Sequence, residues 1–324
     1  MRHALFGCTG ILAAALAATP APAATPAYPA KPVRFIVPFG VGGPGDALGR
    51  LVGKKLTESL GQSVVIDNRA GATTIIGTEM AAQSPPDGYT LLLISTTHAV
   101  NQTLFQKLPY DPLHDFAPIT MIAATPFMLV VHPSVAAKTV PELIALARAK
   151  PGQLSYGSSG NGSSIHLTTE LLNMAAKTQM VHVPYKGSGP AFIDLIGGQI
   201  NLLFSSTVSS LPHVKTGKVR ALAVTSAKRV AALPGIPAIA EYYAGFESSS
   251  WFGMLVRAKT PKPIVDRLFA ETRAALTAPD VSQALISQGA EPGGNSPAEF
   301  AAFFAAEIKK WGAVVKAAGI KLEQ

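Results

Sequence analysis

One repeated pattern constrains this chain most: a short apolar stretch, then a loop rich in glycine or serine, then an amphipathic stretch. In the first repeat we expect a strand at residues 33–37 and a helix at residues 46–60, which Gly61 ends. The pattern recurs through the middle of the chain. Such alternation predicts an α/β fold, with parallel strands and with helices on the faces of the sheet.

The other elements follow from the same spacing. We expect further strands at residues 63–67, 90–94, 127–131, 154–156, 180–184, 200–204, 220–225 and 251–256. We expect further helices at residues 75–83, 140–149, 163–176, 188–197, 208–216, 261–277, 280–288 and 297–318. Because only helical segments follow the last strand, the chain is expected to return to its first sheet. This predicts one lobe of residues 28–130 plus 251–324, a second lobe of residues 131–250, and a binding cleft between them.

The N-terminus has the parts of a secretory signal peptide. Arg2 and His3 precede an apolar run over residues 4–18, and the small-x-small sequence of residues 21–23 follows. We therefore expect residues 1–23 to be removed on export. No later stretch is long and apolar enough to span a membrane, so the mature protein is expected to be soluble.

Composition excludes several classes of protein. The chain is 48% hydrophobic and 14% charged, which excludes intrinsic disorder. The formal net charge is +8, but no block of consecutive Lys or Arg is present, so nucleic acid is not expected as a partner. The single cysteine excludes a disulfide framework, and the histidines are not paired at metal-ligand spacing. We expect neither a metal nor a cofactor.

The loop at residues 38–46 joins the first strand to the first helix and contains four glycines. Glycines let a ligand approach the backbone, and a helix N-terminus offers free N–H groups to an anion. The glycine spacing does not match a dinucleotide fingerprint. The candidate ligand residues are Phe39, Gly40, Val41, Gly42, Gly43 and Asp46. The alternative is a tight turn that Asp46 caps.

The loop at residues 157–164 again joins a strand to a helix. It lacks the Gly-Lys-Ser/Thr of a phosphate-binding loop and the Gly-x-Ser-x-Gly of a nucleophile elbow. Backbone donors and short hydroxyls remain, and these suit a carboxylate held by uncharged groups. The candidates are Ser158, Ser159, Asn161, Gly162, Ser163 and Ser164. The alternative is a flexible loop in which Ser163 or Ser164 caps the helix.

Three more strand ends carry polar candidates. They are Tyr185, Lys186 and Gly187, then Ser205 and Ser206, and finally Ser95 and Thr96. Lys186 would meet an anion or be a solvated surface charge, Tyr185 would stack on a ligand or pack, and the hydroxyls would bind a ligand or cap helices. Ser158 or Ser159 with His166 as a base would suit an exported serine hydrolase, but no third partner is evident.

Several short motifs occur in order along the mature chain. They include Ile36-Val37-Pro38-Phe39 with Gly42-Gly43, Asn68-Arg69, Pro86-Asp87-Gly88-Tyr89-Thr90, Leu108-Pro109-Tyr110-Asp111-Pro112, Tyr156-Gly157-Ser158, His182-Val183-Pro184-Tyr185-Lys186-Gly187 and Ser250-Trp251-Phe252-Gly253. In these motifs the chain resembles the Bug (TctC-like) solute receptors of tripartite tricarboxylate transporters. The resemblance implies the α/β fold of a two-lobed periplasmic binding protein, type II-like, in which each lobe is a sheet flanked by helices.

The resemblance also implies function and site residues. It implies a monomeric receptor that closes on a small di-, tri- or aromatic carboxylate, without chemistry, and works with two membrane subunits. Carried onto this sequence, the ligand-holding loops are Phe39–Gly43, the 71–75 loop with Ala72, Thr73 and Thr74, Ser158–Ser164, and Tyr185–Gly187. A periplasmic receptor that feeds a two-component signalling system is the alternative.

The chain departs from the family pattern at three places. Gly40-Val41 replaces a proline pair, Thr73-Thr74 replaces a glycine pair, and Ser205 stands where the family often has Asp. Without that carboxylate, a ligand ammonium has no obvious partner. We therefore expect the far end of the ligand to be neutral, aromatic or a second carboxylate rather than an amine.

Overall fold

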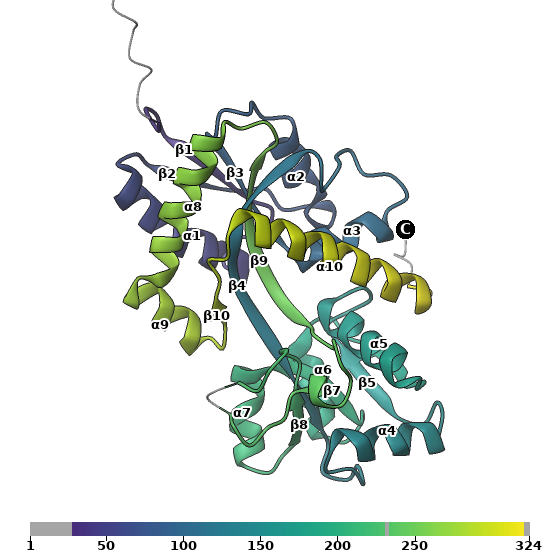
Figure 1. Ribbon diagram of the computed structural model, residues 1–324. Helices are drawn as coiled ribbons and strands as arrows, with labels where there is room; N and C mark the ends of the chain where they lie inside the picture. The colour runs from purple at the N-terminus through teal and green to yellow at the C-terminus, as the bar shows by residue number, and fades with distance from the viewer. Residues whose placement is uncertain (1–27, 231–232, 321–324) are drawn as a thin grey trace, which may run out of the picture.

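The structure, a computed structural model, describes residues 28–230 and 233–320. The expected signal peptide at residues 1–23 lies outside these residues. Figure 1 shows two groups of strands and helices, which we call the first and the second lobe, joined by two long strands. Within the described part, no helix combines the length and the apolar character that a bilayer crossing requires.

The first lobe is built on β1 (Val33–Val37), β2 (Val64–Asn68) and β3 (Thr90–Ser95), which are parallel in the order β2-β1-β3. Alternate side chains of β1 enter opposite cores, as expected for a strand covered on both faces. One face is covered by α1 (Pro44–Leu60), α8 (Lys262–Thr277) and α9 (Pro279–Ser287). The other face is covered by α2 (Ile75–Ala82), α3 (Thr96–Leu104) and α10 (Pro297–Ala317).

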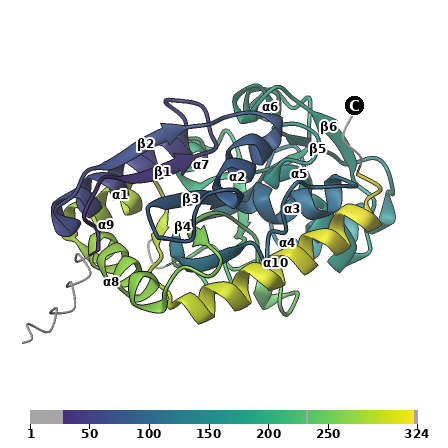
Figure 2. The same cartoon turned by 90° about the horizontal axis from the view of Figure 1, so that it is seen from above.

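The second lobe contains β5 (Ser155–Ser158), β6 (Val181–Pro184) and β7 (Leu202–Ser206), which are parallel to one another. Its remaining elements are α4 (Val140–Ala149), α5 (Ser164–Ala176), α6 (Ser188–Ile196), α7 (Thr207–Lys215), β8 (Arg220–Val224) and the 3-10 turn η2 (Ile239–Glu241). The C-terminal helix α10 packs on α3 and β4 and also contacts α5, so it lies along both lobes (Figure 2).

Two strands connect the lobes. β4 (Phe116–Val131) pairs with β9 (Ser249–Arg257) as far as Pro126, and from Phe127 onward it pairs with β7. The hydrogen-bonded partner therefore changes between Pro126 and Phe127, whereas sequence analysis placed the crossing near residue 130. The sheet is mixed rather than parallel, because β4 runs antiparallel to β7, β8 and β9. A chain that enters the second lobe on one strand must return on a strand of opposite direction.

Two elements were not predicted, and a third was predicted only in part. Sequence analysis placed a strand at residues 127–131, which are the last five residues of β4. The structure accommodates Pro118 at a register shift of the β4–β9 pair, where the ladder is already interrupted. α3 begins directly after β3, with the Ser95 hydroxyl accepting a 3.2 Å hydrogen bond from the Thr97 N–H. The short strand β10 (Glu291–Pro292) pairs with β4.

A buried carboxylate joins the C-terminal helix to β9. Glu307 of α10 is only 4% exposed, and its Oε2 accepts 2.7 Å hydrogen bonds from the indole Nε1 of both Trp251 and Trp311. Lys310 forms an ion pair with the same carboxylate. Both indole rings are fully buried. One side chain therefore satisfies two donors that solvent does not reach.

His98 of α3 lies in an aromatic cluster with Tyr110, Phe116 and Phe304. The ring is 1% exposed, and within the described residues neither of its nitrogens has a hydrogen-bond partner. Burial lowers the pKa of His98 from 6.5 to about 3. The imidazole is therefore neutral at physiological pH and occupies a site that suits an apolar ring.

We expect His98→Phe to flatten the pH dependence of stability. Unfolded His98 takes up a proton near pH 6.5 and folded His98 only near pH 3, so the wild type loses stability as the pH falls through this window. At pH 5 the variant should retain about 2 kcal/mol of the free energy of unfolding, which the wild type has lost to protonation of unfolded His98. At pH 8 the variant should be at least as stable as the wild type. Denaturant titrations at the two pH values measure this. Equal losses in both proteins would contradict it.

Candidate ligand-binding site between the lobes

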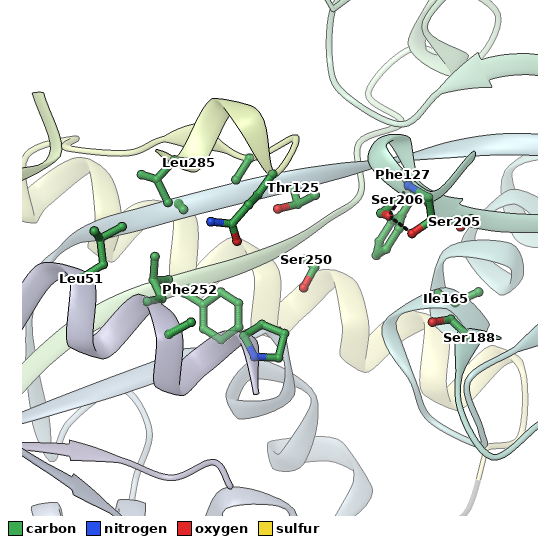
Figure 3. A pocket seen from close by; sticks show the side chains of 17 residues that line it. Leu51, Thr125, Phe127, Ile165, Ser188, Ser205, Ser206, Ser250, Phe252 and Leu285 are labelled. Carbon is green, nitrogen blue, oxygen red and sulfur yellow. Dashed lines mark hydrogen bonds between the residues drawn. The ribbon is translucent and has the colours of Figure 1, made fainter. Parts of the chain in front are cut away.

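A pocket of about 400 Å³ lies between the lobes, and Figure 3 shows its side chains. The lining comes from both lobes and from both connecting strands. The lining residues are Pro44, Ala47, Leu48, Leu51, Ala123, Thr125, Phe127, Ile165, Ser188, Ser205, Ser206, Ser209, Ser250, Phe252, Leu285, Gln288 and Ala290. Its volume is within the range usual for small-molecule sites.

The floor of the pocket is made of cross-strand pairs on β4 and β9. Ala123 pairs with Phe252 and Thr125 pairs with Ser250, and farther along β4 Phe127 pairs with Ser206 of β7. These β4 residues are two apart, so they share one face of the strand. The floor therefore changes from apolar to hydroxyl-bearing as it passes from the first lobe toward the second.

Two walls differ in chemistry. On the side of the first lobe, α1 contributes Ala47, Leu48 and Leu51, and Leu285 of α9 faces the same space. On the side of the second lobe, hydroxyls lie at the starts of α6 and α7, among them Ser188 and Ser205. Figure 3 shows Leu51, Leu285 and Phe252 at one end, Ser188, Ser205 and Ser206 at the other, and Ser250 between them. The described lining holds no ionisable side chain.

Helix N-termini supply the positive potential that this pocket lacks in side chains. α6 has Gly187 as its N-cap, with no side-chain cap, so its N-cap offers no side-chain oxygen to which the first-turn N–H groups could donate. α1 likewise has no side-chain cap on its N-cap Gly43. By contrast, Ser163 caps α5 and Ser206 caps α7. The hydroxyls of these two serines thus serve their own helices.

Asp46 fixes the loop between β1 and α1. Its carboxylate accepts hydrogen bonds from the Arg50 guanidinium at 3.1 Å, the Gly42 N–H at 2.9 Å and the Asn68 amide at 3.0 Å. These donors, Arg50 first, lower the pKa of Asp46 to about 2. The structure therefore places Asp46 in the first turn of α1, where it holds the Gly42 N–H, in keeping with the tight turn that sequence analysis held as the alternative.

The rest of that loop surrounds the start of α1. The Phe39 ring packs edge-on against Phe252, which lines the pocket, at a centroid distance of 5.7 Å. Val41 is 75% exposed, and a Cβ added at Gly40 or Gly42 would meet no atom within 4 Å. The loop thus has open space beside it, while Pro44, just after Gly43, lines the pocket.

The 71–75 loop is strained. Ala72, Thr73 and Thr74 form the 3-10 turn η1 with φ values of 44°, 53° and 76°, which β-branched residues rarely adopt. The buried amide of Asn101 donates a 2.7 Å hydrogen bond to the Thr73 carbonyl and supports this turn. None of the three residues lines the pocket.

Two histidines support the loop between β5 and α5. The Ser158 hydroxyl lies 2.6 Å from His182 Nε2, and His166 Nδ1 accepts a 3.1 Å hydrogen bond from the Gly162 N–H. The two imidazole rings stack with centroids 3.7 Å apart. Burial, followed by the neighbouring His182, lowers the pKa of His166 to about 4, which keeps Nδ1 free to accept.

Ser158 is therefore part of the scaffold rather than an exposed nucleophile. It is fully buried, and its hydroxyl also bonds to the Gly160 backbone. Ser159, Gly162 and Ser164 are half-buried and Asn161 is exposed, and none of them lines the pocket. The loop places Ile165, the residue that follows it, in the lining of the pocket.

The remaining candidates occupy supporting positions. The Tyr185 hydroxyl donates a 2.7 Å hydrogen bond to Asp194, and Lys186 is exposed at the surface. Gly187 has a φ of 116°. The Thr96 hydroxyl accepts a 3.2 Å hydrogen bond from the Trp251 N–H at the start of β9, so it ties β9 to α3. Neither Ser95 nor Thr96 lines the pocket.

Of the predicted site residues, Ser205 and Ser206 line the pocket themselves, and three of the predicted loops place the adjoining residues Pro44, Ile165 and Ser188 there. Sequence analysis named no site residue on the connecting strands or on α9. The spacing of two residues between Thr125 and Phe127, and between Ser250 and Phe252, was a signal that each pair shares one face of a strand. Nothing in the sequence pattern brings Leu285 to the same pocket.

Comparisons with known proteins agree with this architecture. Residues 48–320 match the model of the family described as tripartite tricarboxylate transporter family receptor. The chain is 40% identical over 287 residues to the UPF0065 protein in the tcbD-tcbE intergenic region of Pseudomonas sp. strain P51, covering 88% of this chain and 85% of the relative. It is 38% identical over 312 residues to Protein BugT of Bordetella pertussis, covering 95% and 96%.

Solved structures extend the similarity to the fold. R. palustris Rpa4515 with adipate is 40% identical, with a TM-score of 0.72, and the match covers 91% of this chain and 99% of that chain. A ligand-free TctC solute-binding protein from Polaromonas is 27% identical, with a TM-score of 0.81 and coverage of 90% and 99%. The chain therefore belongs to the receptor family of tripartite tricarboxylate transporters, whose members are periplasmic substrate-binding proteins and not enzymes.

Proposed function

We propose that this chain binds a small carboxylate in the periplasm and presents it, as a monomer, to the two membrane subunits of a tripartite transporter. The observation that carries the proposal is the pocket between the lobes. It combines the uncapped start of α6 with the hydroxyls of Ser188 and Ser205, and it holds no acidic side chain among its described lining. The adipate in the structure of the 40% identical relative supports a carboxylate ligand.

Uncharged donors are sufficient to hold one carboxylate. A hydrogen bond to a charged group contributes about 1.5–3 kcal/mol, and a helix N-terminus adds a favourable dipole. Two first-turn N–H groups of α6 and two serine hydroxyls would together offset the loss of carboxylate hydration. The described lining holds serine hydroxyls but no side chain that could act as their general base, and the proposed mechanism is binding followed by closure.

Closure would bend the connecting strands. We place the hinge where β4 changes partner, between Pro126 and Phe127, and at the start of β9. The first lobe would then comprise residues 28–126 and the segment from β9 onward, a small revision of the boundaries expected from sequence. The TM-score is higher with the ligand-free relative than with the more identical adipate-bound one, which supports an open arrangement here.

A thermal-shift screen of the mature chain tests the proposal. The panel contains citrate, dicarboxylates, aromatic and aliphatic monocarboxylates, nicotinate and acidic amino acids. A ligand at a concentration of 100 times its dissociation constant should raise the free energy of unfolding by about 2.7 kcal/mol. The melting temperature should then rise by several degrees. We expect such a shift with carboxylates and not with matched amides. The protein is unfolded and refolded first to remove any retained ligand, so a screen without a carboxylate hit contradicts the proposal.

A further inference from the structure

The end of the pocket that lies in the first lobe has its own chemistry. Leu48, Leu51, Phe252 and Leu285 converge there from three different elements. Leu48 is 7% exposed and Leu285 is 3% exposed, so both belong to the core of the first lobe as well as to the pocket wall. This chamber is therefore a continuation of a packed apolar core and not a loose surface groove.

The helix α1 carries three cations, Arg50, Lys54 and Lys55, and none of them lines the pocket. Arg50 bonds to Asp46 and to Asn68, and Lys55 pairs with Asp280 at 2.8 Å. Lys54 is exposed at the surface. A second carboxylate placed in the chamber would lose its water without gaining a counter-ion, which is strongly unfavourable.

The floor sets the direction and the reach of a bound molecule. From Phe127 through Thr125 to Ala123, the β4 side chains go from the hydroxyl-rich end to the apolar end. The four residue steps from Phe127 to Ala123 span roughly 13 Å. A molecule whose carboxylate meets Ser205 would thus direct its body over Thr125 and into the leucine chamber (Figure 3).

We infer that the cargo is a monocarboxylate with an apolar aliphatic or aromatic body, whose far end enters the chamber formed by Leu48, Leu51, Phe252 and Leu285. The inference rests on the proposed function and narrows it. The Gln288 amide is the one long polar side chain in the described lining, and it leaves room for a neutral polar substituent such as a hydroxyl or a carbonyl. A charged far end would meet no cationic side chain in the described lining.

Matched pairs of ligands test the inference. Hexanoate and adipate share a carbon skeleton, as do benzoate and terephthalate, and each pair differs by one carboxylate. Isothermal titration should show the monocarboxylate of at least one pair binding at least tenfold more tightly than its partner. If adipate, terephthalate or malate binds more tightly than the monocarboxylates, the inference is wrong and the carboxylate receptor stands. If no carboxylate binds, the proposed function itself fails.

A charge placed in the chamber gives a second test. Leu51→Lys puts a cation at its wall, and the half-buried position lets the long side chain reach solvent. The ratio of adipate to hexanoate affinity should rise at least tenfold. Leu51→Met keeps the volume and the apolar character and should leave that ratio within about twofold. Equal ratios in the two folded variants would show that the far end of the ligand lies elsewhere.

Discussion

A Ser205→Asp variant is expected to bind the carboxylate identified by the screen at least 100-fold more weakly than the wild type. Ser205 is 3% exposed and lines the hydroxyl-rich end of the pocket. An aspartate there would place one carboxylate against another within a few ångströms. At an effective dielectric constant of about 20, two unit charges 4 Å apart repel by about 4 kcal/mol, which exceeds the 2.7 kcal/mol of a 100-fold loss.

The matched control is Ser205→Asn, which has the size of aspartate without its charge. We expect this variant to lose less than tenfold in affinity, because the amide still offers a donor. Both variants are measured by isothermal titration after their melting temperatures have been compared. Equal losses in the two would show that volume, and not charge, decides binding at this position, and would remove Ser205 from the carboxylate end of the site.

The largest expected effect on stability is at Glu307. Glu307→Leu removes the acceptor of both Trp251 and Trp311 and leaves two fully buried indole N–H groups unpaired. The Lys310 ammonium loses its ion pair but keeps its 3.0 Å hydrogen bond to the Glu247 carbonyl. Each unpaired buried donor costs about 1–3 kcal/mol. We expect the free energy of unfolding to fall by about 3–5 kcal/mol and the melting temperature by about 6–15 °C.

Glu307→Gln separates hydrogen bonding from charge. Its amide oxygen still accepts from the indoles, so we expect the variant to lose less than half of what Glu307→Leu loses. Calorimetry and urea titration at pH 7 measure both. Ligand affinity should stay within about twofold in both variants, since Glu307 does not line the pocket. A Glu307→Leu protein that melts within 2 °C of the wild type would contradict this account.

Most of the helices could be predicted because their ends carry local signals. Gly61 adopts the left-handed conformation that ends α1, and Ser296 caps α10 in a capping box with Glu299. α3 was missed because it follows β3 with neither glycine nor proline between them. The first half of β4 was missed, and its Pro118 lies where a tertiary feature, the register shift in the pairing with β9, accommodates it.

The site was harder to predict than the fold, because the same residue types bind ligands and cap helices. Ser163 and Ser206 both follow strands and both looked like ligand donors, yet each accepts a hydrogen bond from its own helix. Sequence could not separate these uses, since the answer depends on where each side chain points. Residues such as Leu285 reach the pocket only through the packing of α9, which no local pattern encodes.

The floor of the pocket consists of the strands that bend in the proposed closure. A ligand therefore makes contacts of two kinds. Contacts with Thr125 and Ser250 exist whether the cleft is open or shut, so they strengthen both forms equally and leave the balance between them unchanged. Only groups on the facing walls, such as Ser188 and Leu51, gain contacts as the gap narrows. A small acid that reaches only the floor would therefore bind in the pocket without favouring closure of the lobes. Such an acid would compete with the cargo for the pocket and would not itself be transported.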